Sequence, residues 1–300
     1  MPHPPIRLIA FDLDGTILNT EKDVSPRTRA ALQAAREKGV ILLPATGRTL
    51  ANLAATVTAL PGVRYAMTSN GAALWDLGRD PAAAVRSRWG ENQNTPAGRL
   101  PADAACIGLS PLPAAQALAV YDCLVPFLPG NLKAFVHGRS VCEPPCYAWE
   151  QAHGSAGFRP GPGLSTVVPD LRAYLAARPD TLEKVCMFFR DLPTLQAARA
   201  ALAAIPGITV VQGSPDNLEI TAPGIDKGSG LRAICRLLDV PVEQTLALGD
   251  SENDLGMLRD AGVAGVMANG TPEALAMADI VSPADNDHDG AARLIEQLCL

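Results

Sequence analysis

Short apolar runs alternate with helical stretches along the first part of the chain. Leu8 to Phe11 is a continuous apolar run followed at once by acidic residues, which indicates a buried strand whose carboxyl end reaches a site. Ser25-Pro26 then supplies a helix cap and a proline at the first helical position, and Gly39 ends that helix. Val40 to Leu43 is predicted as the second buried strand. Strands and helices in this order are typical of a parallel sheet.

Turn signals divide the region after the second strand. We expect a helix over Leu50 to Leu60, a break at Pro61-Gly62 and a third strand near Tyr65 to Met67. Asn70-Gly71 is a hairpin-turn signal, so Met67 to Trp75 is predicted to form a hairpin off the sheet.

The middle of the chain, from about Pro81, has a different composition. Residues 90–113 and 144–169 are rich in Pro, Gly and Ser and are predicted to be connections outside a compact sheet. A helix-strand-strand order occurs twice around them. The first unit comprises Pro113 to Val125, Leu132 to Val136 and Arg139 to Cys142, and the second comprises Leu192 to Ala204, Ile208 to Gln212 and Leu218 to Thr221, preceded by the apolar run Val185 to Phe189. The repeat predicts a small α+β domain inserted into the first domain.

The alternation of helices and strands resumes at Pro223. The expected elements are helices over Lys227 to Leu238, Asn253 to Asp260, Pro272 to Ala278 and Ala291 to Leu298, and strands over Thr245 to Leu248, Val263 to Met267 and Ile280-Val281. The chain is therefore predicted to have an α/β fold. Residues 1–82 and 223–300 form its Rossmann-like parallel-sheet core, and residues 83–222 form the inserted α+β domain.

Length and composition agree with a two-domain protein. The 300 residues exceed the usual size of one compact domain, and 48% hydrophobic with 19% charged residues is the composition of a soluble globular protein. A net charge of −6 supplies no broad basic field, which argues against nucleic acid or an anionic membrane surface as a partner. No apolar run reaches the ~18 residues of a spanning helix. Because the seven cysteines are scattered and odd in number, we expect reduced thiols and a cytoplasmic protein.

Two acidic residues follow the first predicted strand. Asp12 and Asp14 are two residues apart, so the strand period of two directs both carboxylates to the same side. Gly15 and Thr16 let the chain turn directly afterwards. Two carboxylates in one pocket repel each other unless a cation lies between them, and a hard metal such as Mg²⁺ is the natural one.

Polar residues also lie at the ends of later strands. Asp250 and Asp254 flank the end of a second apolar strand and the start of the next helix, where they complete an oxygen shell. Lys227 begins a helix of the core and is placed to neutralise a nucleophile and a phosphate. Thr46 and Gly47 follow the second strand and offer a hydroxyl and backbone N–H groups to phosphate oxygens. Open α/β sheets bind ligands at this edge, so these residues predict phosphoryl-transfer chemistry.

Four motifs in this order resemble those of the haloacid-dehalogenase superfamily of phosphatases. They are Asp12-Leu13-Asp14-Gly15-Thr16, Thr46-Gly47-Arg48, Lys227-Gly228 and Gly249-Asp250-Ser251-Glu252-Asn253-Asp254. Asn70-Gly71-Ala72 and the large insert make the chain similar to the Cof-type sugar-phosphatase branch, whose cap is a second α+β domain. The resemblance covers the core at both ends of the chain, about half of the residues, while the insert is longer than usual for the branch.

The resemblance implies a role for each matching residue. Asp12 is the nucleophile that forms an aspartyl phosphate, and Asp14 is the general acid and later the base that activates water. Asp12, the backbone carbonyl of Asp14 and Asp250 hold Mg²⁺, with Asp254 supporting the metal site. The residues that bind phosphate are Thr46, Gly47, Lys227, Asn253 and the backbone N–H of Leu13, with Arg48 as a further contact to phosphate or substrate.

Structural interpretations compete with several of these roles. Taken alone, the first motif is as compatible with a turn or a calcium loop as with catalysis, and the three later motifs favour catalysis. Lys227 alone is compatible with a solvated residue at a helix start, and Asn253 with a helix cap. Asn70-Gly71 is more often a hairpin turn than a substrate contact.

The inserted segment contains further candidates. His137, Cys142, Cys146 and His153 are residue types that bind zinc, but their spacing matches no standard finger, and buried thiols are the default interpretation. Trp149 and Phe158 are suited to stack on a substrate, although packing against the inserted domain is favoured.

The leading functional hypothesis is a Mg²⁺-dependent hydrolase of small phosphorylated metabolites, sugar phosphates or related compounds, acting as a monomer or small homo-oligomer. A phosphomutase shares the aspartyl-phosphate step and is the first alternative. A phosphometabolite-binding protein without turnover is the second. A P-type ion pump requires membrane helices, and a dinucleotide oxidoreductase requires a glycine-rich fingerprint after the first strand, where this chain has acidic residues.

Overall fold

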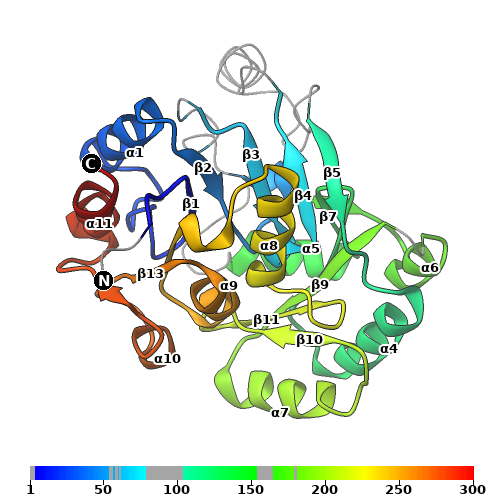
Figure 1. Cartoon of the computed structure of the whole chain (residues 1–300). Coiled ribbons are helices and arrows are strands. Elements are labelled where there is room, and N and C mark those ends of the chain that lie inside the picture. The colour runs from blue at the N-terminus through cyan, green and yellow to red at the C-terminus, as the bar shows by residue number, and fades with distance from the viewer. Residues whose placement is uncertain are drawn as a thin grey trace, which may run out of the picture.

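The computed structural model describes residues 4–53, 57, 60, 62–78, 104–153, 165–178 and 181–300. Its strands form a five-stranded core sheet, a six-stranded sheet that we call the cap sheet, and a three-stranded sheet beside the core (Figure 1). The helices are α1 Pro26–Glu37, α4 Ala114–Leu124, α5 Pro144–His153, α6 Leu171–Ala176, α7 Leu192–Leu202, α8 Lys227–Leu237, α9 Leu255–Asp260, α10 Pro272–Leu275 and α11 Gly290–Cys299.

The core sheet is parallel throughout, with the order β14-β13-β12-β1-β2. Its strands are β1 Leu8–Phe11, β2 Ile41–Pro44, β12 Thr245–Gly249, β13 Val263–Val266 and β14 Ile280–Val281. β1 lies at the centre, with the next strand in sequence on one side and β12 on the other. The strand order therefore reverses between β1 and β12, which is where open α/β sheets bind ligands.

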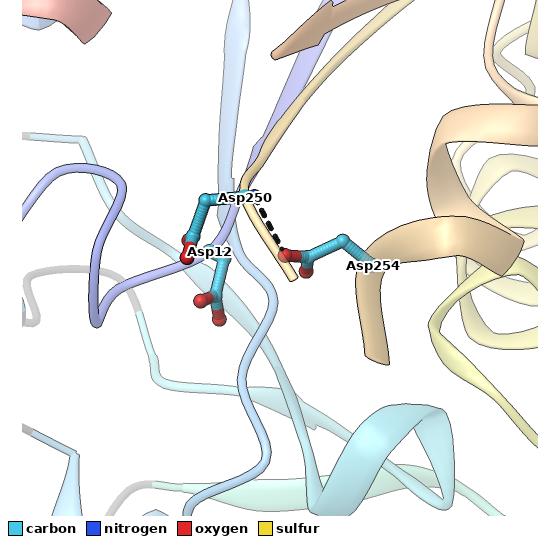
Figure 2. Close-up of side chains that lie close together, drawn as sticks. All are labelled: Asp12, Asp250 and Asp254. Atoms are coloured by element: carbon cyan, nitrogen blue, oxygen red, sulfur yellow. Dashed lines mark hydrogen bonds between the residues drawn. The ribbon is translucent and has the colours of Figure 1, made fainter. Parts of the chain in front are cut away.

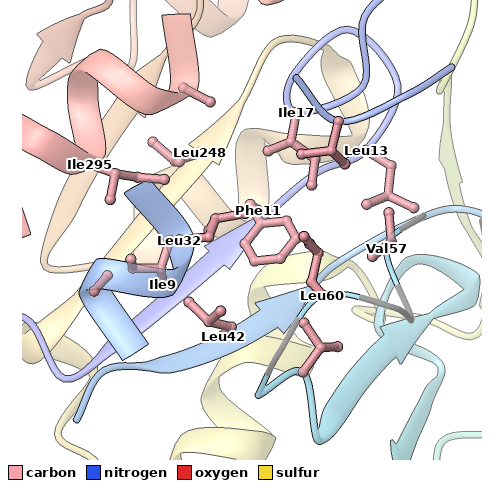
Figure 3. Close-up of a cluster of buried hydrophobic side chains, with 14 of the residues drawn as sticks. Ile9, Phe11, Leu13, Ile17, Leu32, Leu42, Val57, Leu60, Leu248 and Ile295 are labelled. Carbon is pink, nitrogen blue, oxygen red and sulfur yellow. The ribbon is translucent and has the colours of Figure 1, made fainter. Parts of the chain in front are cut away.

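Helices cover both faces of the core sheet. Ile9 and Phe11 face a cluster that includes Leu32 of α1 and Ile295 of α11, as Figure 3 shows around the ring of Phe11. The alternate residues of β1 face the opposite cluster, to which α8, α9 and α10 contribute. In Figure 1, α1 and α11 lie together on one side of the core, with α8 and α9 on the other. This alternation is the reason that β1 is apolar at every position, because both of its faces are buried.

The three-stranded sheet begins with the predicted hairpin. β3 Tyr65–Thr68 and β4 Ala73–Asp76 are antiparallel around Asn70-Gly71, and β5 Ala105–Leu109 pairs with the other edge of β4. β3 meets the core sheet through one parallel bridge, between Met67 and Ala45. It therefore continues the core sheet only loosely.

The cap sheet is antiparallel except at one edge, with the order β10-β11-β9-β6-β7-β8. Its strands are β6 Asn131–Val136, β7 Arg139–Cys142, β8 Ser165–Val167, β9 Leu182–Phe188, β10 Thr209–Val211 and β11 Asn217–Thr221. Its apolar face packs on α4, α6 and α7, which lie along the outer side of the molecule in Figure 1. Its other face turns toward the core and is polar, as described below.

The predicted fold class is confirmed: a parallel α/β core carries an additional, mostly antiparallel cap sheet. Helix α1 begins after Ser25, whose side chain accepts from the N–H of Thr28, and Gly39 follows the helix end with φ +85°. The division at residues 83 and 222 stays a prediction. β5 follows the first of these positions and pairs with β4, which precedes it.

The prediction that residues 90–113 and 144–169 are connections is wrong in three places. Ala105–Leu109 and Ser165–Val167 are strands, and Pro144–His153 is helix α5. Prolines at the start of a helix are tolerated because the first helical N–H groups have no partner within the helix. Residues 90–103 and Phe158 lie outside the described residues, and of the helix predicted over Leu50 to Leu60 the structure describes a 3₁₀ turn at Leu50–Asn52.

Within the part of the chain that the structure describes, no helix is long and apolar enough to cross a membrane. All seven cysteines are free.

Candidate active site

Two neighbouring strands deliver the first acidic residues to the same place. β1 and β12 are in register from Leu8 to Phe11, and Asp12 and Asp250 directly follow their ends. The backbone N–H of Asp12 donates to the carbonyl of Leu248 at 2.9 Å, which continues the ladder by one step. The point at which the strand order reverses therefore has a carboxylate on each side.

Asp254 joins this pair from the start of the following helix. Carboxylate oxygens of Asp12, Asp250 and Asp254 lie within 4.8 Å of one another (Figure 2). Asp254 Oδ2 accepts the backbone N–H groups of Asp250 at 2.9 Å and Ser251 at 3.0 Å. Because its oxygens are engaged by the protein, Asp254 holds the loop that carries Asp250.

Lys227 supplies the positive charge within the cluster. Its Nζ donates to Asp12 Oδ1 and to Asp254 Oδ1, both at 2.6 Å, and its side chain is fully buried. It is the first residue of α8, whose N-cap Asp226 forms a capping box with Ser229. A cation is disfavoured at a helix N-terminus and in a buried position. The two carboxylates overcome both effects and hold the pKa of Lys227 above its usual value.

The three carboxylates of the cluster carry more negative charge than the single lysine can neutralise. Burial, together with the charges of Asp254 and Asp250, raises the pKa of Asp12 well above its usual value even though Lys227 opposes this effect. Burial and the charge of Asp254 raise the pKa of Asp250 to about 7. Three clustered carboxylates with one lysine are a hard-oxygen donor set that a divalent cation would stabilise. The residues present therefore fit a metal ion such as Mg²⁺.

A glycine makes room for the second carboxylate. Gly15 has φ +79°, and a Cβ at this position would lie 2.5 Å from Asp250 Oδ2. Thr16 Oγ1 donates to Asp250 Oδ1 at 2.7 Å from the same turn. The Gly-Thr pair after Asp14 thus fixes the orientation of Asp250, because no larger residue fits the left-handed conformation against it.

Asp14 lies at the mouth of the site between two cations. Arg48 donates to it through Nε at 2.9 Å and Nη2 at 2.7 Å, and Lys22 donates through Nζ at 2.9 Å. Burial raises the pKa of Asp14, but the charges of Arg48 and Lys22 outweigh it and hold the pKa below its usual value. Arg48 thus contacts Asp14 here, and Lys22 is a site residue that we did not predict.

The other predicted phosphate contacts surround the same opening. Thr46 and Gly47 follow β2, and Thr46 Oγ1 accepts the backbone N–H of Arg48 at 3.1 Å. Asn253 lies beside them, with its Oδ1 accepting from Ser251 Oγ at 3.0 Å. The side chain of Leu13 is buried in the core, so only its backbone can reach the site. The structure therefore brings the residues of all four motifs together.

A cavity of about 130 Å³ lies between this site and the polar face of the cap sheet. Its lining includes Asp12, Asp14, Thr46, Gly47, Arg48 and Asn253 from the core, and Lys133, Phe135, Glu150, Cys186, Phe188, Asn217 and Glu219 from the cap. The core site is therefore roofed by cap side chains.

Buried polar contacts tie the roof to the core. Lys184 Nζ donates to Glu219 and to the carbonyl of Gly47, both at 2.5 Å. Asn70 Nδ2 donates to Glu219 Oε2 at 2.6 Å, and Asn70 Oδ1 accepts from Asn253 Nδ2 at 3.4 Å. Asn70 thus lies in the hairpin turn and also links the cap to Asn253 of the core.

None of these cap residues was predicted as part of the site. Their signal is the period-two alternation of the cap strands. In β11, for example, Asn217 and Glu219 face the cavity while Leu218 and Ile220 pack in the cap core. The pattern identifies a polar face but does not say what that face meets.

The zinc and stacking candidates of the inserted segment lie elsewhere. Cys142 and Cys146 are buried in the apolar cluster of the cap. His153 stacks on Trp149 with ring centroids 4.6 Å apart. Among the described residues, the group whose ligand atoms converge is that of Asp12, Asp250 and Asp254.

Comparisons with known proteins agree with this geometry. A family model described as haloacid dehalogenase-like hydrolase matches residues 9–81 and 172–295. The chain is 28% identical to pyridoxal phosphate phosphatase YbhA of Escherichia coli, with 96% of this chain and 97% of the relative covered. It is also 28% identical to the HMP-PP phosphatase of Cronobacter sakazakii, covering 90% and 87%. The solved structure of the subclass IIB sugar phosphatase BT4131 superimposes with a TM-score of 0.75 at 22% identity, covering 97% and 98%.

Proposed function

The chain belongs to the haloacid dehalogenase-like hydrolase family, and from that premise we propose that this phosphatase hydrolyses small phosphate monoesters through an aspartyl phosphate on Asp12. The observation that carries the proposal is the largely buried cluster of Asp12, Asp250, Asp254 and Lys227 beside a cavity that cap side chains also line. Two relatives are named for pyridoxal phosphate and HMP-PP, and a structural neighbour for sugar phosphates. These names support a small phosphorylated metabolite as the substrate.

In the proposed first step, a carboxylate oxygen of Asp12 attacks phosphorus, and the bond between phosphorus and the ester oxygen breaks. Lys227 neutralises Asp12 and the phosphate, while Thr46, Gly47, Asn253 and the N–H of Leu13 hold the phosphate oxygens. When bound by Asp12, Asp250 and the backbone carbonyl of Asp14, with Asp254 as support, Mg²⁺ supplies positive charge to the transferring phosphoryl group.

Asp14 is proposed to move the protons. It donates one to the leaving oxygen, and it then takes one from the water that attacks the phosphorus of phospho-Asp12 and releases phosphate. Its lowered pKa keeps the carboxyl group ionised, which is the form that can accept a proton from water. A phosphate that draws Arg48 and Lys22 toward itself raises the pKa of Asp14, as the acid role requires.

A phosphate-release screen tests the proposal. We expect release from sugar phosphates or from phosphorylated cofactors in the presence of Mg²⁺, and none after chelation with EDTA. The control measures the products by chromatography, because a phosphomutase yields an isomeric phosphate in place of free phosphate. An enzyme that is fully active in EDTA contradicts the metal site.

Magnesium is expected to stabilise the protein more at pH 8 than at pH 5. Asp12 and Asp250 have raised pKa values, that of Asp250 being about 7, so the metal-free folded state binds more protons than the unfolded state between about pH 4 and pH 7. Its stability therefore falls as the pH rises through that window, and bound Mg²⁺ offsets the loss. At a free Mg²⁺ concentration about 100 times its Kd, we expect Mg²⁺ to raise Tm by about 5 °C at pH 8.

Thermal melts with EDTA and with Mg²⁺ at both pH values measure this effect. Asp250→Asn is the control, because it removes the titrating group and the ligand together and so reduces the Mg²⁺ increment at pH 8. Equal increments at both pH values in the wild type argue against Asp12 and Asp250 as the ligands.

Arg48→Gln is expected to lower kcat/KM about tenfold and to move the acid limb of the kcat–pH profile, where Asp14 acts as the base, upward. Arg48 lowers the pKa of Asp14 through its charge and through two hydrogen bonds, so its loss returns that pKa toward the usual range. Lys22→Gln is the matched variant, which removes a cation that makes one hydrogen bond to Asp14, and a smaller shift is expected from it. Profiles that coincide with the wild type leave Asp14 without a role in proton transfer.

The seven free cysteines support the further proposal that the enzyme works in a reducing compartment, the cytoplasm.

A further inference from the structure

One charged pair of the cavity is used by none of the steps above. Lys133 on β6 and Glu150 on α5 both line the cavity and are almost fully buried, with Lys133 Nζ 2.5 Å from Glu150 Oε1. Taking two charges out of water is costly, and apolar residues of the same size commonly give equal or greater stability. Stability alone is therefore a weak reason for an ion pair in this position.

Lys133 and Glu150 differ in how many of their hydrogen-bonding groups have partners within the protein. Glu150 is held at both oxygens, since Oε1 accepts from Lys133 and Oε2 accepts from Ser165 Oγ at 3.2 Å. The ammonium of Lys133 has three N–H donors, of which the described residues take one as a hydrogen bond. Its other described contact is the ring of Phe188, with Nζ 5.1 Å from the centroid. Glu150 thus fixes a lysine that lines the cavity and has N–H donors beyond this one hydrogen bond.

The second lysine on this face, Lys184, is more fully engaged and is not among the residues that line the cavity. Its Nζ also lies 4.6 Å from the centroid of the Phe135 ring. Lys184 Nζ is engaged by Glu219 and by the carbonyl of Gly47, and Glu219 is engaged by Asn70 as well. That network joins the cap to the core. Lys133 therefore differs from Lys184 in lining the cavity and in having two N–H donors, against one, beyond its hydrogen bonds to the described residues.

The register of the cap sheet places Lys133 away from the phosphate contacts. Lys133, Cys186 and Glu219 form one row across β6, β9 and β11. Two strand spacings of about 4.8 Å each put Lys133 roughly 10 Å from Glu219. Glu219 itself lies over Gly47, because a Cβ on Gly47 would be 2.8 Å from Glu219 Oε2. The phosphate end of the cavity is therefore at Glu219 and the remote end at Lys133.

Apolar rings flank this row. Phe135 is two residues beyond Lys133 on β6, Phe188 is two residues beyond Cys186 on β9, and both rings line the cavity. Asn131, two residues before Lys133, is fully buried, and neither polar atom of its side chain has a partner in the described structure. The remote end of the cavity thus combines the remaining donors of Lys133 with apolar walls, and Asn131 lies on the same face of β6 without being one of the lining residues.

Resting on the proposed phosphatase function, we propose that Lys133, held by Glu150, is the specificity-determining residue for the leaving group. It binds a hydrogen-bond acceptor at the end of the substrate remote from the phosphate, namely a hydroxyl, phenolate or carboxylate oxygen. The preferred substrates are compact phosphate monoesters that carry such an oxygen, and a phosphate ester or anhydride without one is a poor substrate.

The first test removes the pair without leaving an unpaired buried charge. Lys133→Met combined with Glu150→Gln is compared with Arg172→Met combined with Asp122→Asn, which removes an exposed cap ion pair of 2.7 Å. For each protein, kcat/KM is measured with glucose 6-phosphate, pyridoxal 5′-phosphate and acetyl phosphate. The selectivity for the better of the two larger substrates over acetyl phosphate is expected to fall at least about tenfold in the first variant only.

A second variant keeps the lysine and serves if the first fails to fold. Glu150→Gln retains an acceptor for Lys133 but removes the negative charge beside it. The ratio of kcat/KM for 3-phosphoglycerate over glycerol 1-phosphate is therefore expected to rise at least about threefold, because the lysine charge is no longer neutralised.

The outcomes separate this inference from the function on which it rests. Unchanged selectivity ratios in folded variants overturn the role of Lys133 and leave the phosphatase proposal intact. A wild-type enzyme that releases phosphate from none of the five compounds with Mg²⁺ counts against both proposals.

Discussion

Asp12→Asn is expected to lower kcat for phosphate release by about 10⁴-fold or more while the protein stays folded. An amide at this position cannot form the aspartyl phosphate. Among the described residues, Asp12 is the carboxylate that both accepts a hydrogen bond from Lys227 and lines the cavity. The side chain keeps its size, and the loss of one of three clustered negative charges removes repulsion with Asp250 and Asp254. We therefore expect Tm in EDTA to equal or exceed that of the wild type.

Single-turnover phosphate release and thermal melts on the same preparations measure both parts of this prediction. Asp23→Asn is the matched control, since this acid lies on the surface of the same N-terminal segment with a side chain 58% exposed. Its activity is expected to equal that of the wild type. An Asp12→Asn enzyme with wild-type turnover is incompatible with the proposed nucleophile.

Lys227→Met is expected to cause the largest loss of stability together with a loss of activity. The substitution leaves Asp12 and Asp254 buried without their shared cation, and breaking such a pair costs about 3–5 kcal/mol. In a protein of this size that cost corresponds to a fall in Tm of about 10 °C. The loss of a positive charge beside the phosphate is expected to lower kcat by about 10²- to 10³-fold.

A second substitution separates the charge effect from the loss of packing. Asp254→Asn added to Lys227→Met removes one of the unpaired carboxylates, so it is expected to restore part of the lost Tm but not the activity. Lys22→Met is the control for a lysine near the site, because its side chain is 30% exposed and its loss leaves no buried charge unpaired. A Lys227→Met protein as stable as the wild type contradicts the buried network.

The elements of the core were predictable because their signals are local. Leu8–Phe11 was predicted as β1 to the residue, and the cap and end signals of α1 matched its bounds. The short strand β8 and helix α5 were missed because the stretch of chain around them is rich in Pro, Gly and Ser. Their structure depends on tertiary contacts, since β8 pairs with β7 and α5 packs against β6. Propensity is a weak guide wherever tertiary contacts provide most of the stability.

The candidate site also has features that the sequence predicts and features that depend on tertiary contacts. The amino-acid sequence by itself determined the parallel core, the positions of the four motifs and the meeting of Asp12 with Asp250, because carboxyl ends of neighbouring parallel strands always share one edge of a sheet. Only the tertiary structure decided that Arg48 and Lys22 hold Asp14, and that Lys133, Glu150 and Glu219 line the cavity from the cap. The alternation of polar residues in the cap strands defines a face, but what that face meets depends on contacts between residues far apart in the chain, such as the 149 positions between Asn70 and Glu219.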